Sequence, residues 1–229
     1  SPAAASALLP LGADQLGRDE LSRLLAGGQT SLTVALGATA IAVLIGVLVG
    51  LLAGYLGGLF DILSMRFVDL LLSLPFLLIA IAVNQSIGDP KLWTLCLLLG
   101  FLSWTSLARV TRTKTQQVCA LDYVQAARAL GLKPHQILWR HVLPNVLAPA
   151  IVLGSTLVAR MVIAESAMSY LGLGVQPPTA SWGSMLRDAQ DLMTHTPRLL
   201  FFPGALIICT VFGFNLLGEG LRDALDPKE

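Results

Sequence analysis

Residues 31–56 run without a single charged side chain, and this run limits the fold more than any other feature of the sequence. A helix crosses the hydrocarbon core of a bilayer with about 20 apolar residues, so we predict a membrane-spanning helix here. Within the run, Gly46, Gly50 and Gly54 recur every four residues on one helical face. Such a stripe lets a second helix approach closely, so we expect these glycines to mediate helix packing. Glycines without a packing role are the alternative.

The composition supports a membrane protein, because the chain of 229 residues is 55% hydrophobic and only 13% charged. Ordinary soluble domains carry about 25% charged residues. The apolar residues cluster into further spans, the second of which contains Pro75 and is therefore expected to be kinked. The sequence predicts an all-α, polytopic transmembrane helical bundle over residues 31–217. After the first run, we expect spans at residues 66–84, 92–108, 144–171 and 199–217.

The distribution of Lys and Arg predicts the orientation of these spans. Residues 109–143 are rich in cations and contain a single acid, Asp122, and cytoplasmic loops carry the excess of Lys and Arg. We therefore expect this segment and the tail, residues 218–229, on the cytoplasmic side. The loop 172–198 and a lead with a short amphipathic helix, residues 1–30, are expected outside. This arrangement leads us to expect one more span upstream of Ser1 in the full protein.

The segment LDYVQAARALGLKPHQILWRHVLPN, residues 121–145, is polar and basic in a chain that is mostly apolar. Asp122 and Gln125 have the spacing of a capping box, which predicts a helix start. The helix should carry one face formed by a tyrosine, two alanines and a leucine: Tyr123, Ala126, Ala127 and Leu130. Because alanine side chains are small, a partner could pack closely against this face.

Gly131 is placed to end this helix in the left-handed conformation, and Pro134 is suited to the first turn of a second helix. Pro144 then opens the next span. Three interpretations of this unit compete: a solvated loop, a DNA-reading helix–turn–helix, and a docking element that passes force from another protein to the flanking spans. The DNA interpretation is disfavoured, because the unit is short and tethered at both ends to spans, and the net charge is only +1. The short tethers favour docking.

The pattern QAARALG, followed by LPN at residues 143–145, resembles the "EAA" loop of ABC importer permeases. That family has Glu-Ala-Ala, three residues, Gly and a later Leu-Pro. This chain has Gln125 in place of the Glu and His141 at a position that is usually apolar. Three other stretches are similar to the C-type permease subunit of dipeptide, oligopeptide and nickel importers. They are LGADQLGRDELSRLL, AESAMSYLGLGVQPPTASWGSML and FNLLGEGLRDALDP, and together the resemblance covers nearly the whole chain in order.

The resemblance implies a MetI-like ABC importer permease subunit in the bacterial inner membrane. It implies a second homologous permease, two ATPase subunits that bind ATP and Mg, an extracytoplasmic substrate-binding protein and the lipid bilayer as partners. The expected cargo is di- or oligopeptides, with nickel chelates or another small solute as the alternative. The residues that it assigns to coupling with the ATPase are Asp122, Tyr123, Gln125, Ala126, Ala127, Arg128, Gly131, Leu132 and Pro144.

Sequence motifs disfavour other classes of function. No lysine follows a glycine, so the chain lacks the Gly-Lys-Ser/Thr of a phosphate-binding loop, and ATP hydrolysis would belong to another subunit. There is no Gly-x-Ser-x-Gly or His-Glu-x-x-His motif. Cys96, Cys119 and Cys209 are odd in number and far apart, which argues against a disulfide framework or a metal site. An intramembrane enzyme and a structural membrane subunit remain as distant alternatives.

Several residues are candidates for the transport path and its outer surface. Arg160 and Glu165 lie within a predicted span, where a charge usually faces a pathway or another subunit; the alternative is charged groups that snorkel to the interface. Asp69 is expected near the interface more than in the path. Four residues of the outer loop are candidates for contact with the binding protein, with a Pro-stiffened connection and an interfacial Trp as the alternative: Gln176, Pro177, Pro178 and Trp182.

Overall fold

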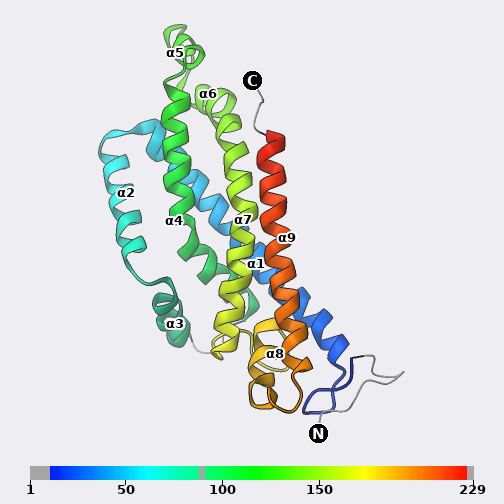
Figure 1. Cartoon of the computed structure of the whole chain (residues 1–229). Helices are drawn as coiled ribbons and strands as arrows, with labels where there is room; N and C mark the ends of the chain where they lie inside the picture. The colour runs from blue at the N-terminus through cyan, green and yellow to red at the C-terminus, as the bar shows by residue number, and fades with distance from the viewer. Residues whose placement is uncertain (1–10, 88–90, 226–229) are drawn as a thin grey trace. The chain divides into compact units, whose positions relative to one another are not determined.

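The computed structural model describes residues 11–87 and 91–225, and within them it contains helices and an isolated bridge but no strand (Figure 1). The predicted all-α class is therefore confirmed. Residues 1–10 of the expected lead and 226–229 of the expected tail lie outside the described residues. The elements are α1 (Glu20–Leu56), α2 (Gly58–Ser73), α3 (Phe76–Ile87), α4 (Leu92–Cys119), α5 (Asp122–Ala129), α6 (Pro134–Ile137), the π-helix η1 (Leu138–Val142), α7 (Leu143–Tyr170), α8 (Trp182–Ala189), the 3₁₀-helix η2 (Gln190–Leu192) and α9 (Arg198–Leu225).

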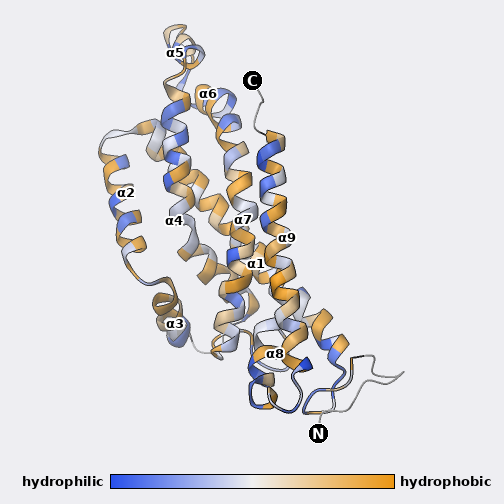
Figure 2. Cartoon of the chain, in the orientation of Figure 1, coloured by the Kyte–Doolittle hydropathy of each residue, from blue (hydrophilic) through white to orange (hydrophobic). Residues whose placement is uncertain are grey.

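Four stretches of helix are long and apolar enough to cross a bilayer: α1, α4, α9 and Pro134–Tyr170, which joins α6, η1 and α7. Figure 2 shows apolar residues along most of the length of α1, α7 and α9. The pair α2 and α3 passes the same test only together, as a broken span bent by 89°. With that pair, the described chain has five candidate spans, as predicted.

The second span differs from the expected kinked helix, because it is two helices separated at Leu74 and Pro75. Leu74 adopts an extended conformation, with φ −92° and ψ 137°. A proline disfavours the helical conformation in the residue before it, so the helix ends at this position and a new one starts after the proline.

The first helix starts earlier than expected. Asp19 caps α1, because its carboxylate accepts a hydrogen bond from the backbone N–H of Ser22 at 3.1 Å. The hydroxyl of Ser22 also donates to this carboxylate and lowers the pKa of Asp19 from its ordinary value. The amphipathic helix expected within residues 1–30 is thus not separate, since α1 continues from Glu20 to Leu56 without interruption.

The described residues divide into two compact units. The first unit consists of the described residues within Ser1–Ala38, Ala80–Leu99 and Val158–Phe214, and the second of those within Thr39–Ile79, Gly100–Leu157 and Asn215–Glu229. The coupling candidates and the glycine stripe lie in the second unit. Glu165 and the outer loop lie in the first.

The glycine stripe of α1 packs against α4 within the second unit, which is the kind of close approach that such a stripe allows. A methyl group on Gly46 would lie 2.8 Å from a side-chain carbon of Leu107. One on Gly50 would lie 2.7 Å from the Cβ of Thr111, and one on Gly54 would lie 2.7 Å from the carbonyl oxygen of Arg112. These separations are too short for carbon atoms, so each position admits only glycine unless the two helices move apart.

Replacing Gly50 by leucine is therefore expected to destabilise the chain by about 1–3 kcal/mol or more, because overpacking forces the two backbones apart. Thermal unfolding of the detergent-solubilised protein, followed by size-exclusion chromatography, measures the effect. Gly213→Leu is a matched control, since a methyl group at Gly213 meets no atom within 4 Å. Equal melting temperatures for the two variants would contradict the packing described for α1 and α4.

Candidate functional site

The polar segment predicted for coupling folds as two short helices, α5 and α6, that connect α4 to the π-helix η1 and α7. The helix α5 starts at Asp122, one residue earlier than a capping box would require, and no side chain caps it. The predicted capping box is therefore wrong. The amide of Gln125 instead donates to the carbonyl oxygen of Cys119 at 2.7 Å. This carbonyl is one of the last in α4, which lack partners within their own helix.

The end of α5 follows the prediction. Gly131 has φ +79°, its N–H donates to the carbonyl oxygen of Arg128 at 3.0 Å, and the N–H of Leu132 donates to that of Ala127 at 3.2 Å. These two bonds form a Schellman motif, for which the left-handed conformation is required. Pro134 occupies the first turn of α6, as expected. The turn is therefore fixed by its own backbone bonds.

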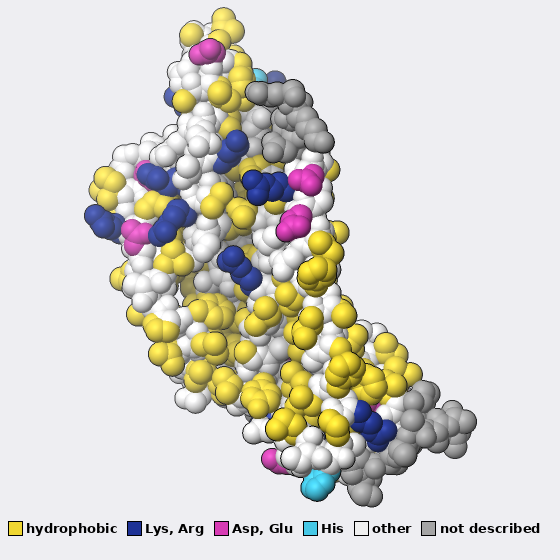
Figure 3. Space-filling model, viewed as in Figure 1, with side chains coloured by type: hydrophobic (Ala, Val, Ile, Leu, Met, Phe, Trp, Pro, Cys, Tyr) yellow, Lys and Arg dark blue, Asp and Glu magenta, His cyan; other side chains and the backbone are white. Residues whose placement is uncertain are grey.

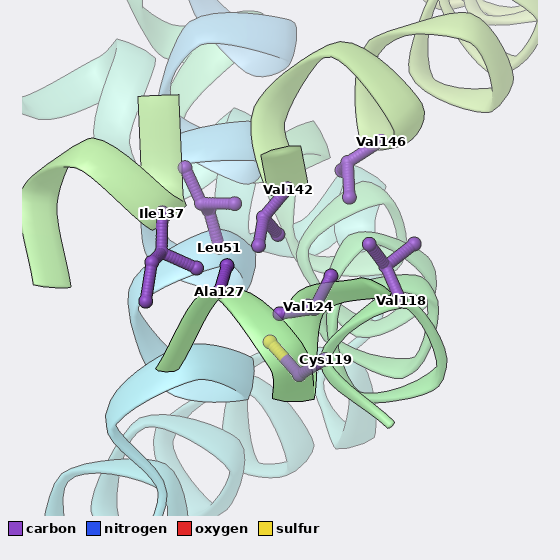
Figure 4. Packing of buried hydrophobic residues seen from close by; sticks show 8 residues of the cluster. All are labelled: Leu51, Val118, Cys119, Val124, Ala127, Ile137, Val142 and Val146. Carbon is purple, nitrogen blue, oxygen red and sulfur yellow. The ribbon is translucent and has the colours of Figure 1, made fainter. Parts of the chain in front are cut away.

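The inner face of α5 belongs to a hydrophobic cluster, which we call the coupling core: Leu51, Val118, Cys119, Val124, Ala127, Ile137, Val142 and Val146. Figure 4 shows these side chains converging from α1, α4, α5, α6, η1 and α7. Ala127 is only 7% exposed, so its expected place on a surface for a partner is wrong. Leu132 packs against the same cluster. Ala127 and Leu132 thus hold the segment to the spans.

The outer face of α5, which we call the docking face, is formed by Tyr123, Ala126 and Leu130. Leu130 is 81% exposed and Tyr123 is 44% exposed, and Ala126 is also exposed. Asp122 lies exposed beside them at the start of the helix. Hydrophobic side chains are visible at this end of the chain in Figure 3. Exposed apolar side chains that gather on one short helix indicate a surface for another protein.

Polar contacts join the segment to α1 and α7. The hydroxyl of Tyr55, at the end of α1, donates to the carbonyl oxygen of Pro134 at 3.2 Å, and the guanidinium of Arg128 lies 5.5 Å from the centre of the Tyr55 ring. The amide of Asn145 donates to the hydroxyl of Tyr123 at 3.2 Å and to the carbonyl oxygen of His141 at 2.7 Å. Sequence analysis missed Tyr55, because nothing near it in the chain indicates its partner.

A π-helical turn connects the segment to α7. The N–H of Leu143 donates to the carbonyl oxygen of Leu138, five residues earlier. Pro144 follows directly and is exposed. A proline cannot donate to the carbonyl four residues before it and its ring would collide with that group, so a wider turn at this point accommodates it. The break in regular α-helix lies where the polar segment ends and the span begins.

The first unit contains a buried carboxylate. Glu165 is 1% exposed, and its two oxygens accept hydrogen bonds from the hydroxyls of Ser31, at 2.7 Å, and Ser169, at 2.6 Å. The partners of Glu165 are thus two residues of this chain, rather than pathway water or another subunit as expected. Arg160, in contrast, is exposed on α7.

Trp182 is also buried, with 5% of its surface exposed. Its indole N–H donates to the carbonyl oxygen of Leu24 at 3.0 Å, and its backbone N–H donates to the hydroxyl of Ser31 at 3.2 Å. The expectation of an exposed Trp182 that meets a binding protein is therefore wrong. The residue fastens the start of α8 to α1 instead.

The other three candidates of the outer loop, Gln176, Pro177 and Pro178, are exposed. They line a cleft of about 440 Å³ within the first unit, together with charged residues of both signs. Asp188 lies in this cleft, where desolvation raises the pKa of its carboxyl from the ordinary value although Arg18 acts in the opposite direction. The cleft offers a charged surface bordered by residues of the loop 172–198.

Two ion pairs join α2 to α4 in the second unit. Asp69 Oδ1 lies 2.6 Å from Arg109 Nη2, and both side chains are about half exposed. The guanidinium of Arg112 donates from Nε and Nη2 to the two carboxylate oxygens of Asp61, which is 8% exposed. Sequence analysis did not single out Asp61, since an acid near the start of a span resembles an interfacial residue.

The comparisons with known proteins agree with this geometry. The family model described as "Binding-protein-dependent transport system inner membrane component" matches residues 46–229. The chain belongs to this family. The match includes the coupling core, the docking face and the ion pairs of α2 and α4, and it confirms the resemblance found from the sequence.

Three relatives show how far the similarity extends. The oligopeptide transport system permease protein OppC of Escherichia coli (strain K12) is 42% identical, over 95% of this chain and 72% of its own length. OppC of Bacillus subtilis (strain 168) is 39% identical over 95% of this chain and 71% of its own. The glutathione transport system permease protein GsiD of Escherichia coli O1:K1 / APEC is 42% identical over 95% and 71%.

Solved structures share the fold. An inward-facing structure of the MetNI methionine ABC transporter has a TM-score of 0.73 at 17% identity, covering 90% of this chain and 97% of the other. An amino acid ABC transporter with histidines has a TM-score of 0.60 at 17% identity, covering 90% and 94%. This member of the inner membrane component family is thus an all-α, multi-pass membrane protein with the fold of ABC importer permeases, and it works within a transporter complex.

Proposed function

We propose that this chain is a permease subunit of an ATP-driven ABC importer that carries di- or oligopeptides across the bacterial inner membrane. It forms the translocation path with a second, homologous permease. Two ATPase subunits bind ATP and Mg and dock on the coupling segments, and an extracytoplasmic binding protein delivers the cargo. The relatives reported above are named for oligopeptides and for glutathione, which is itself a small peptide. Their names favour peptides over nickel chelates, and a transport role over an enzyme or a purely structural subunit.

The observation that carries the coupling role is the two-sided construction of α5. One side is locked into the coupling core, and the other presents Leu130 and Tyr123 to solvent. A partner that binds the docking face therefore acts on a rigid element. Displacement of α5 is transmitted to α1 through Leu51, to α4 through Val118 and Cys119, to η1 through Val142 and to α7 through Val146.

This construction suits a cycle in which nucleotide controls transport. ATP binding draws the two ATPase subunits together, and each coupling segment follows its own ATPase subunit. The spans attached to the segment then change the access of the path from one side of the membrane to the other. Such coupling requires that the ATPase with ATP binds one state of the permease more tightly than the other.

Exposed and charged residues indicate the outer surface and the transport path. Gln176, Pro177 and Pro178 border the charged cleft of the first unit, and they form the surface offered to the binding protein. Arg160 is exposed on α7 and is charged within a span, so it faces the path or the second permease. Residues 109–143 and the C-terminal tail lie on the cytoplasmic side, where the ATPase subunits are.

A pull-down of the tagged full-length protein from its native membranes in mild detergent tests the coupling role. We expect a second permease and ATPase subunits to be recovered and identified by mass. With Ala126→Arg, recovery of the ATPase should fall at least about tenfold, because a long charged side chain then projects from the docking face, and a misplaced buried charge costs several kcal/mol.

Ala224→Arg is the matched control, because it adds the same charge at an exposed position of α9 outside the segment. The second permease should be retained by both variants. If the ATPase is recovered equally with Ala126→Arg and with wild type, or is absent from the wild-type preparation, then α5 is not the docking element.

A further inference from the structure

A second hollow lies in the second unit, with a volume of about 960 Å³. Its walls are one face of α4, one face of α7 and the end of α9, and we call it the basic groove. Leu121 and Pro144, on either side of the coupling segment, form part of its lining, so the groove lies at the same end of the spans as that segment. The lining residues are Arg109, Val110, Thr113, Lys114, Gln117, Val118, Leu121, Pro144, Asn145, Ala148, Pro149, Val152, Leu153, Arg222 and Leu225.

The charge of the groove is one-sided. Three of its lining residues, Arg109, Lys114 and Arg222, are cations, and none is an acid. Arg109 is paired with Asp69, but Lys114 and Arg222 have no ion pair within the part of the chain that the structure describes. Figure 3 shows Lys and Arg side chains over α4 and, beside Asp and Glu side chains, over α9 on this face. Unpaired cations at the end of apolar spans favour an anion as their partner.

The rest of the groove is mostly apolar. Val110 on α4 and Pro149, Val152 and Leu153 on α7 form an apolar wall of the groove, and both helices are candidate membrane spans. A small hydrophilic anion would make no contact with this apolar wall. A transported peptide would also bring its ammonium end to a lining that has no acid. The lining therefore matches a molecule with an anionic head and a hydrocarbon tail.

We propose that the basic groove binds an anionic phospholipid of the cytoplasmic leaflet. The phosphate lies between Lys114 and Arg222, and an acyl chain lies along the apolar face of α7. Basic pockets between spanning helices on the cytoplasmic side of other membrane proteins bind anionic lipid head groups. The cytoplasmic position of the groove follows from the orientation of the coupling segment, but lipid binding itself does not depend on the transport function.

The test uses the tagged protein, with the subunits that co-purify, in nanodiscs that contain phosphatidylcholine and phosphatidylglycerol in equal amounts. Native mass spectrometry counts the lipids that stay bound when the protein is released. We expect wild type to retain phosphatidylglycerol over phosphatidylcholine. In the double variant Lys114→Gln and Arg222→Gln, the preference for phosphatidylglycerol should fall by about tenfold or more. Each Lys or Arg near an anionic head group strengthens binding by about fivefold.

The control is the double variant Arg66→Gln and Lys133→Gln, which removes two exposed cations that do not line the groove. It should retain the preference of wild type. The proposal is overturned if wild type shows no preference, or if the two double variants lose phosphatidylglycerol equally. It is also overturned if Ala148→Cys forms efficient cross-links to the second permease, because protein then fills the groove. Each readout is independent of ATPase recovery, so it separates this proposal from the coupling role.

Discussion

Uptake of peptide is expected to fall at least about tenfold when Gly131 is replaced by valine, while the protein remains in the membrane. A methyl group at Gly131 meets no atom within 4 Å, but its φ of +79° lies in the left-handed region. That conformation costs an L-residue about 1–2 kcal/mol, and a β-branched residue is a more severe outlier. The Schellman bonds to Arg128 and Ala127 would be lost with the turn, so α5 would no longer be held against the coupling core.

Uptake of a labelled peptide in cells, normalised to the amount of chain in the membrane by immunoblot, measures this effect. Gly131→Asn is the matched control, because asparagine tolerates the left-handed conformation far better than other non-glycine residues. We expect it to keep most of the activity. Wild-type uptake by the valine variant would show that the turn has no part in coupling, and equal loss in both variants would show that the effect is not conformational.

Trp182→Ala is expected to destabilise the protein by about 3–5 kcal/mol, as for other large aromatic side chains removed from a packed site. The indole fits against Gly28 of α1, where a methyl group would lie 2.8 Å from a ring carbon. Its removal leaves a cavity and leaves the carbonyl oxygen of Leu24 without the indole N–H. The start of α8 would then lose its main attachment to α1.

Thermal unfolding of the purified protein in detergent measures this loss. Trp93→Ala is the control, because Trp93 belongs to the same unit but is 61% exposed. Its substitution should change the melting temperature little. A binding-protein contact of the kind expected from the sequence would give the opposite pattern, in which Trp182→Ala unfolds like wild type and only transport is reduced.

The sequence was most informative where local chemistry decides the structure. The charge-free run predicts a span because no other structure suits it, and Gly131 and Pro134 predict a turn because the backbone demands those residues. The glycine stripe predicts a close approach, although the partner helix, α4, could not be known. In each case the signal and its cause lie within a few residues of one another.

The sequence was least informative where the partner is distant in the chain. From the sequence alone, Trp182 suggests a functional surface and Glu165 suggests the transport path. In the structure both are buried, and they form hydrogen bonds with Ser31 and Leu24, which are more than a hundred residues away in the chain. Asp61 pairs with Arg112, which is also distant in the chain, at a separation of 51 residues. The broken span at Pro75 was underestimated because periodicity reports the length of an apolar segment and not the direction of its two halves.

The hydrogen bond from Gln125 to the carbonyl oxygen of Cys119 bears on whether subunits of different transporters can be exchanged. A glutamate at this position could not donate to a carbonyl oxygen, so its carboxylate would turn outward and offer a charge to the ATPase. In this chain the amide is used internally, so in the proposed complex recognition on this side of α5 would rest on shape and apolar contact. An ATPase that relies on a cation opposite that glutamate would fit this permease poorly, which would keep parallel importers in one cell from mixing their parts.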